Sequence, residues 1–258
     1  MLQEHIGDAA ATRWIELVTR GNMVKSKILL EAPDGGPEAV FASQPDYLSS
    51  AHYHHVAQFQ LVVQGTLRMP TEAIPAIGVH YVDHNVAYGP FTTTPDFLWY
   101  TLHAKAGGQS FMDNAESRKK VNRQGRTLTA WSHESKWKAL GGGVRRQVLL
   151  QEAGGLTAEV VECAAGAALP APGPAAYGRY EVVSNGWVTT PGGKRLDRYG
   201  IRFTKGDTAA AAALTAGAEG ATVAVLTYDA DAAITLGGDM CSRIRMHEQE
   251  LAALRAGK

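Results

Sequence analysis

Two histidines separated by one residue, His52 and His54, are the side chains of this sequence best suited to chemistry. On an extended segment alternate side chains point the same way, so the two imidazoles are expected to face one side. Gln58 follows four residues after His54 with the same parity and offers an amide oxygen. Imidazole and amide groups can both bind divalent metal ions, so the cluster could form a metal site. His55 has the opposite parity and is expected to point elsewhere.

The segment that must position these groups has the composition of a β-strand that ends at a glycine. Residues 59–63 are Phe-Gln-Leu-Val-Val, and Gly65 stands where a tight turn is expected. This order and spacing resemble the first signature of the cupin superfamily, in which an acid stands at the position of Gln58. The resemblance implies a small antiparallel β-barrel in which His52, His54 and Gln58 hold a divalent transition metal.

The bulk composition excludes several partners. With 258 residues, 25 basic and 25 acidic side chains, the sequence has no net charge to attract nucleic acid or an anionic membrane. It has no apolar run long enough to span a bilayer and no secretory signal. Cys163 and Cys241 do not form a disulfide framework. We therefore expect a cytoplasmic protein that acts on a small molecule, with a homodimer as a possible assembly.

The second half of the sequence repeats the first weakly. Segment 57–65 aligns with 178–186 without a gap, and four other pairs of segments follow in the same order: 28–36 with 148–155, 38–43 with 159–163, 78–82 with 200–204, and 98–103 with 223–228. Short strands repeated twice predict an all-β protein with two antiparallel barrels or sandwiches. The arrangement resembles a bicupin, with jelly-roll domains at residues 1–130 and 131–258.

Only the first repeat carries the candidate ligands. The alignment places Arg179 at the position of Gln58, and small residues at the positions of both histidines. From residue 144 to the tail, the second repeat contains no histidine. A metal site is therefore expected in the N-terminal barrel alone, and the C-terminal barrel is a degenerate copy.

Elements outside the repeats are expected to be short helices. Residues 131–140, before three glycines, suggest a short helix, and residues 9–20 suggest either a helix or an exchanged strand. The tail from Cys241 to Ala256 has apolar residues at helical spacing, which predicts an amphipathic helix. Its apolar residues are Ile244, Met246, Leu251 and Leu254.

The second cupin signature is less complete. Counting from Gly65 places its histidine near Tyr88, so the usual histidine is missing there. A second register, ending at His84, lies too close to Gly65 to leave room for the intervening strands. His103 ends a further predicted strand. Tyr88, His84 and His103 are therefore the candidates for orienting substrate or moving protons, and His80 shares the parity of Tyr88.

The neutral Gln58 also influences the expected chemistry. An amide adds no negative charge, so two histidines and Gln58 leave a divalent ion uncompensated and favour an anionic or chelating substrate. The resemblance implies an oxygenase that uses Fe(II), with Mn, Ni or Zn as alternatives. Non-redox isomerase, lyase or cyclase chemistry on the same scaffold is the next candidate. A non-catalytic binding protein with a vestigial metal site is a third.

Overall fold

The computed structural model describes residues 3–19, 21–31, 35–133, 136–171, 173–206 and 213–256. Strands make up 52% of the structure. Two α-helices are found among these residues, α1 (Ala115–Lys119) and α2 (Met240–Ala256). The protein is therefore all-β with short flanking helices, as the sequence predicts. In the described residues no sheet closes on itself, so the predicted barrels are open jelly rolls.

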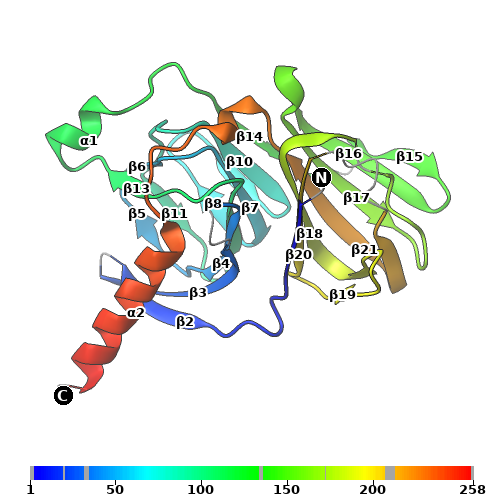
Figure 1. The fold of residues 1–258 in the computed structure, drawn as a ribbon, viewed down its shortest axis with the longest axis horizontal. Helices are drawn as coiled ribbons and strands as arrows, with labels where there is room; N and C mark the ends of the chain where they lie inside the picture. Colours follow the sequence, from blue (N-terminus) through cyan, green and yellow to red (C-terminus); the bar gives the residue numbers. More distant parts are fainter. Residues whose placement is uncertain are drawn as a thin grey trace. The chain divides into compact units, whose positions relative to one another are not determined.

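The chain divides into two compact units, each built from two segments. The N-terminal unit comprises Arg13–Thr129 and Asp231–Lys258, and the C-terminal unit comprises Met1–Thr12 and Ala130–Ala230. The sequence predicts a single division of the chain, at residue 130. The two units differ from that division at both ends of the chain. The first strand belongs to the C-terminal unit, and the terminal helix belongs to the N-terminal unit (Figure 1).

The N-terminal unit is formed by one large and two small antiparallel sheets around an apolar core. The large sheet runs, in order, through β14 (Thr127–Trp131), β10 (Gly78–Val82), β7 (Gln58–Gln64), β12 (Leu98–His103), β4 (Glu38–Ser43), β3 (Asn22–Glu31) and β2 (Ile15–Thr19). The small sheets are β5 (Leu48–Ser49), β11 (Phe91–Thr93), β8 (Thr66–Arg68) and β9 (Ala73–Pro75), and the pair β13 (Gln109–Phe111) with β6 (His52–His54). Alternate side chains of β7 and β12, among them Val62 and Trp99, enter the core. This inward face also carries the polar groups described below.

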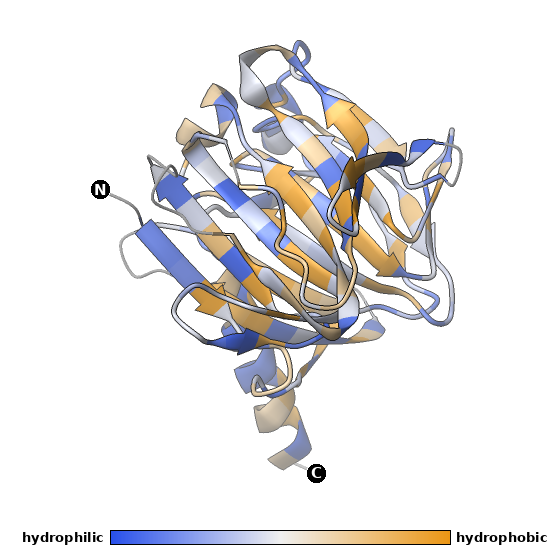
Figure 2. Ribbon diagram, turned by 90° about the vertical axis from the view of Figure 1, so that its right-hand side faces the viewer, coloured by the Kyte–Doolittle hydropathy of each residue, from blue (hydrophilic) through white to orange (hydrophobic). Residues whose placement is uncertain are grey.

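The C-terminal unit has one continuous sheet. It runs through β1 (Gln3–Gly7), β20 (Ile201–Gly206), β18 (Ala175–Thr189), β21 (Thr215–Thr227), β17 (Thr157–Cys163), β16 (Val144–Gln151) and β15 (Lys138–Gly141), and β19 (Arg195–Leu196) pairs with β18. Hydrophobic and hydrophilic residues are interspersed along the strands that face the viewer in Figure 2. Such alternation lets one side of a sheet face a core while the other faces solvent.

The strand order supports the duplication read from the sequence. The order β10, β7, β12, β4, β3, β2 in one unit corresponds to β20, β18, β21, β17, β16, β15 in the other. One aromatic pair is reproduced closely: Phe59 lies 4.8 Å from Tyr81, and Tyr180 lies 4.8 Å from Phe203, between ring centroids. Both pairs join residues directly opposite on neighbouring strands. The match of 98–103 with 223–228, however, is one residue out of register, because Gln58 faces His103 whereas Arg179 faces Thr227.

The structure corrects two of the expected flanking elements. The segment 131–140 does not form an α-helix where it is described: Trp131 ends β14, Lys136 lies in a 3-10 turn, and Lys138–Gly141 is β15. Residues 134 and 135 lie outside the described residues. The three glycines that suggested a helix stop have φ of +87°, +58° and +76° and form the turn between β15 and β16 instead. In the region 9–20, β2 pairs with β3 of its own unit, and the strand that joins the other unit is the earlier β1.

The predicted terminal helix is confirmed as α2, but its apolar stripe is only partly buried. Cys241 and Ile244 are buried, whereas Met246 and Leu254 are exposed. No described helix is both long and apolar enough to cross a lipid bilayer. Cys163 and Cys241 are both buried free thiols.

Candidate functional site

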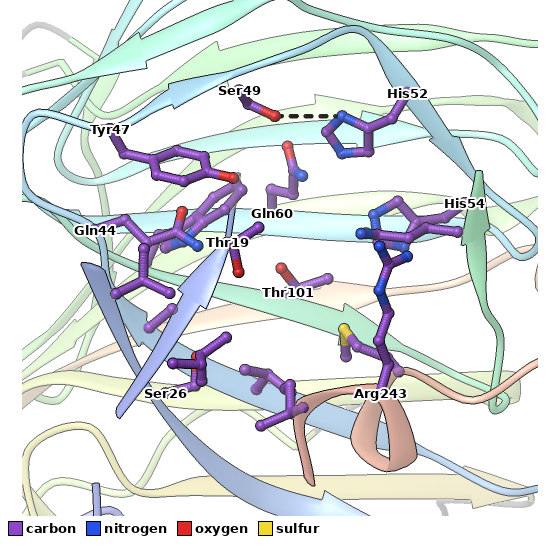
Figure 3. Close-up of a pocket in the computed structure, with 18 of the residues that line it drawn as sticks. Thr19, Ser26, Gln44, Tyr47, Ser49, His52, His54, Gln60, Thr101 and Arg243 are labelled. Carbon is purple, nitrogen blue, oxygen red and sulfur yellow. Dashed lines mark hydrogen bonds between the residues drawn. The ribbon is translucent and has the colours of Figure 1, made fainter. Parts of the chain in front are cut away.

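A pocket of about 120 Å³ lies on the inward face of the N-terminal unit. His52 and His54 enter it from β6, Gln60 from β7 and Thr101 from β12, while Arg243 approaches from α2 (Figure 3). The short strand β6 is held in place by β13, which pairs His54 with Gln109 and His52 with Phe111. Gly65, with φ +75°, makes the predicted tight turn between β7 and β8. The first motif is therefore shaped as its spacing predicts.

The three predicted ligands are all buried, but only the two histidines are among the residues that line the pocket. His52 and His54 are each 5% exposed, and Gln58 is fully buried at the start of β7. The centroids of the two imidazole rings lie 5.5 Å apart. Nδ1 of His54 has no hydrogen-bond partner, and the polar atoms of the Gln58 amide have none beyond an interaction with the Tyr88 side chain. Burying such atoms without partners is costly, so these two residues are suited to receive a metal ion or a ligand.

Burial keeps His54 neutral. It lowers the pKa of His54 well below the ordinary value of 6.5, and His103, whose ring centroid lies 5.2 Å away, lowers that pKa further. A neutral imidazole is the form that binds a metal. The electrostatics of the pocket therefore favour ligation by His54 over its protonation.

His52 belongs to a chain of hydrogen bonds that has one direction. Its Nδ1 donates to the carbonyl oxygen of Ser50 at 2.8 Å, which leaves Nε2 to accept from the Tyr88 hydroxyl at 2.8 Å. Gln60 Nε2 donates to the Tyr88 oxygen at 2.7 Å, and Gln60 Oε1 accepts from His80 Nδ1 at 2.9 Å. The hydroxyl of Thr127 donates to His80 Nε2 at 3.0 Å. Every step thus has one donor and one acceptor while both histidines stay neutral.

Burial sets the protonation state of this chain. It lowers the pKa of His80 to about 3, and the neighbouring His52 contributes to the shift. It also raises the pKa of Tyr88 well above the ordinary value of 10, an effect that Gln58 and Gln60 oppose. Tyr88 therefore stays protonated, and its hydroxyl can donate a hydrogen bond to His52.

The other predicted residues occupy different positions relative to the pocket. Tyr88 lines it. His103 is buried at the end of β12, where its Nδ1 donates to Glu38 Oε2 at 3.1 Å. His84 does not line the pocket: its Nδ1 bonds with Asp231 at 2.7 Å, in a partly exposed pair. Of the three proposed catalytic residues, Tyr88 and His103 are thus brought to the imidazoles and His84 is not.

Several site residues were missed by the sequence reasoning. Gln60 shares the parity of Gln58, a signal that was available, and it joins Tyr88 to His80. Glu38 is almost fully buried and accepts from His103, from the amide of Gly107 at 3.0 Å and from the amide of Met240 at 3.2 Å. This carboxylate therefore positions both His103 and the start of α2.

Arg243, on the first turn of α2, was also missed. It extends toward His54 (Figure 3), and its guanidinium carbon lies 5.3 Å from the ring centroid of Phe111. Its charge contributes to the low pKa of His54. No motif signals this residue, because the sequence does not show which unit the terminal helix covers.

One cluster of potential metal ligands was found elsewhere in the N-terminal unit. Within the described residues, the ligand atoms of Glu31, Asp239 and Cys241 lie within 4.8 Å of one another, a proximity not found for any three histidines or acids at the first motif. Glu31, however, is already paired with Arg245. Burial and the carboxylates of Glu38, Glu31 and Asp239 raise the pKa of the Cys241 thiol, which disfavours the thiolate that a metal requires.

The structure resembles solved proteins of the cupin fold along most of its length. A candidate dioxygenase from Nostoc punctiforme superposes with a TM-score of 0.62 at 11% identity, covering 89% of this chain and 84% of the other. A bacterial pirin in complex with nickel(II), from Escherichia coli, gives 0.56 at 11% identity, covering 88% and 99%. Procruciferin, an 11S globulin from Brassica napus, gives 0.56 at 9% identity, covering 89% and 85%.

The class of protein follows from these likenesses and the strand order. The protein has the cupin fold, present in each of its two units. No family model and no curated protein matches the sequence. Because the similar structures include an enzyme candidate, a nickel-containing pirin and a globulin, the fold alone does not identify the reaction.

Proposed function

We propose that the N-terminal unit binds one divalent transition metal through His52, His54 and Gln58 and acts as an oxygenase on a small anionic or chelating organic molecule. The observation that carries the proposal is the buried Nδ1 of His54, which has no hydrogen-bond partner, beside His52 and near the buried amide of Gln58. The likeness to a candidate dioxygenase and to a nickel-containing pirin supports the same class. We propose Fe(II) as the metal, with Mn, Ni and Zn as alternatives.

The donor set suits such an ion. Two neutral imidazoles and one amide provide three uncharged ligands, so a divalent ion would keep open positions and a net positive charge. A bound ion would supply Lewis acidity and, for Fe(II), a redox centre to the reaction.

The protein's own residues have separate roles in this proposal. Arg243 binds the carboxylate of the substrate at the mouth of the pocket, since a guanidinium matches a carboxylate in charge and shape. Phe91, Trp99 and Phe111 line the pocket and exclude water from the reacting groups. Tyr88 holds a proton on its hydroxyl oxygen, and Gln60 and His80 fix its orientation.

The test combines metal analysis with oxygen consumption. The purified protein would be assayed for bound transition metals and then for oxygen uptake with a panel of small hydroxy, keto and phenolic acids. We expect one metal per chain and substrate-dependent uptake, both lost in the double variant His52→Ala/His54→Ala. A metal-loaded protein that consumes no oxygen but isomerises or cleaves one of these acids would show Lewis-acid chemistry instead.

A second function, metal-free binding of a small acid, is favoured by one contact. His52 Nε2 already accepts a hydrogen bond from Tyr88, which a metal ion would have to displace. If binding of an acid depends on Arg243 but not on added metal, the pocket is a binding site without a metal centre.

A further inference from the structure

The C-terminal unit contains a cavity at the place that corresponds to the pocket of the N-terminal unit. It has a volume of about 270 Å³ and is lined by inward-facing residues of β16, β17, β18 and β21, together with the segment around Leu169. Glu181 and Val225 occupy the positions that Gln60 and Thr101 hold in the other unit, since both pairs lie opposite one another on equivalent strands. The second unit has therefore kept the cavity while changing its chemistry.

Arg179 is the distinctive residue of this cavity. It is 3% exposed, and its hydrogen bonds go to neutral groups: the hydroxyl of Thr227 at 3.2 Å and the carbonyl oxygens of Gly173 and Pro174. Its Nη1 has no hydrogen-bond partner, and it forms no ion pair within the described part of the chain. A buried guanidinium without an ion-pair partner is unfavourable, so a bound anion would stabilise the charge of Arg179.

The carboxylates that face Arg179 are paired with other cations. Glu181 is bonded to Arg202, and Glu159 lies 3.2 Å from Arg146. Both acids line the cavity and counteract the loss of basicity that burial imposes on Arg179, whereas the charge of Arg202 adds to that loss. These two fixed negative charges disfavour a multiply charged ligand, so the available charge suits a monoanion.

We propose that this cavity binds a small organic monocarboxylate whose carboxylate is held by Arg179. Nη1, the one guanidinium nitrogen without a partner, can donate a charge-assisted hydrogen bond to a carboxylate oxygen, while Nε and Nη2 hold the group in place. Val161, Leu169 and Val225 supply apolar walls for the rest of the molecule. The volume lies slightly below the range of about 300 Å³ and upward that is usual for ligand pockets, which limits the ligand to a compact acid. This site is separate from the one proposed above and does not depend on a metal.

The proposal can be tested with sodium benzoate as the probe. Isothermal titration of the wild-type protein would be compared with titration of Arg179→Gln, which removes the charge, and of Arg179→Lys, which keeps the charge but loses the planar guanidinium held by Thr227 and Gly173. We expect benzoate affinity to fall about tenfold or more in both variants. Glutamine lacks the charge, and lysine lacks the extra nitrogens through which Thr227 and Gly173 hold the Nη1 donor in place. Arg243→Gln, which alters only the pocket of the N-terminal unit, should leave this binding event unchanged.

Val225→Phe provides a second route if an Arg179 variant does not fold. It fills the cavity from a partly exposed strand position and keeps the arginine, so it should also abolish the binding event. The proposal is overturned if the wild type does not bind benzoate, if binding survives both Arg179→Lys and Val225→Phe, or if Arg243→Gln alone removes it. Tighter binding of inorganic phosphate than of benzoate would overturn the assignment to a monocarboxylate.

Discussion

The two units use equivalent strands to bury opposite kinds of polar chemistry. In the N-terminal unit Gln60 and His80 face each other across neighbouring strands, and in the C-terminal unit Glu181 and Arg202 face each other in the same way. The first pair is neutral and belongs to a directed chain of hydrogen bonds, whereas the second is an ion pair. The same scaffold therefore buries a neutral hydrogen-bonded pair in one unit and an ion pair at the equivalent position of the other.

Burial affects the charge of the histidines in the N-terminal unit differently from the charge of the arginines in the C-terminal unit. An imidazole responds to a buried site by losing its proton, so His54 and His80 stay neutral and available as acceptors or ligands. An arginine remains charged, so Arg179 must find a counter-charge or neutral partners. The difference between the units can be tested from either side.

The largest expected effect is loss of metal from one unit only. His52→Ala/His54→Ala should abolish tight binding of Fe(II), Ni(II) or Zn(II), because it removes both imidazole ligands. Arg179→Gln is the matched control in the other unit and should leave metal content unchanged. The measurement is metal per chain by elemental analysis, and two metals per wild-type chain would contradict the contrast between the units.

Gln58→Glu should raise metal affinity by about two to three orders of magnitude. An added charge a few ångströms from a divalent ion is worth several kcal/mol at an effective dielectric near 20, before desolvation is subtracted. Gln44→Glu places a carboxylate at another position in the same pocket and should change the affinity much less. Competition with a coloured chelator measures both variants. An affinity for Gln58→Glu equal to that of the wild type would exclude Gln58 from the ligand set.

Removal of the buried Glu38 carboxylate should destabilise the protein by about 3 kcal/mol, because three donors lose their acceptor in the interior. The strand pairing places Thr157 at the equivalent position of the C-terminal unit. There Thr157→Ala should lower stability by no more than about 1 kcal/mol. Urea unfolding followed by circular dichroism compares Glu38→Ala with Thr157→Ala. Equal losses would show that Glu38 has no special structural role.

Acidification should produce the smallest of these effects. His80 stays neutral in the folded protein down to about pH 3, whereas the unfolded chain protonates it near pH 6.5. Between these values the unfolded state binds more protons, so stability falls as the pH drops below 6.5. From pH 7 to pH 4.5 the contribution of His80 amounts to about 2 to 3 kcal/mol.

His80→Gln provides the control for this pH effect. The variant should unfold at a urea concentration that depends less on pH than in the wild type. The equivalent residue of the C-terminal unit, Arg202, stays charged in both states and adds no such dependence. If wild type and His80→Gln lose stability in parallel on acidification, the buried imidazole is not the cause.

Much of the fold could be predicted from local sequence. The His-x-His spacing, Gly65 and the gapless match of 57–65 with 178–186 depend on strand periodicity and turn chemistry, which are local properties. The residue-by-residue alignment of β12 in the first repeat with β21 in the second could not be predicted in this way. Irregular pairing interrupts the ladder of β12 with β7 between Leu98 and Trp99, and it interrupts the ladder of β18 with β21 twice. Each interruption shifts the alignment without leaving a signal in residue type.

The site was only partly predictable for a related reason. His52, His54 and Gln58 lie within seven residues, so parity alone could group them. The parity of Gln58 also extends to Gln60 on the same strand. Glu38 and Arg243 join the site only through tertiary contacts, because β4 lies beside β12 and α2 packs against β2, β3 and β4. His84 follows the same parity as His80, but it lies beyond the end of β10, where alternation no longer applies.

The exchange of terminal elements has a consequence for the order in which the protein can be assembled during its synthesis. β1 leaves the ribosome first, yet its partner β20 is about two hundred residues downstream, and α2 emerges after every strand that it covers. Neither unit can be completed by a nascent chain that stops between them. We therefore expect half-length fragments cut near residue 130 to expose an unpaired sheet edge or an uncovered pocket, so that isolating either unit requires its two segments to be joined in one chain.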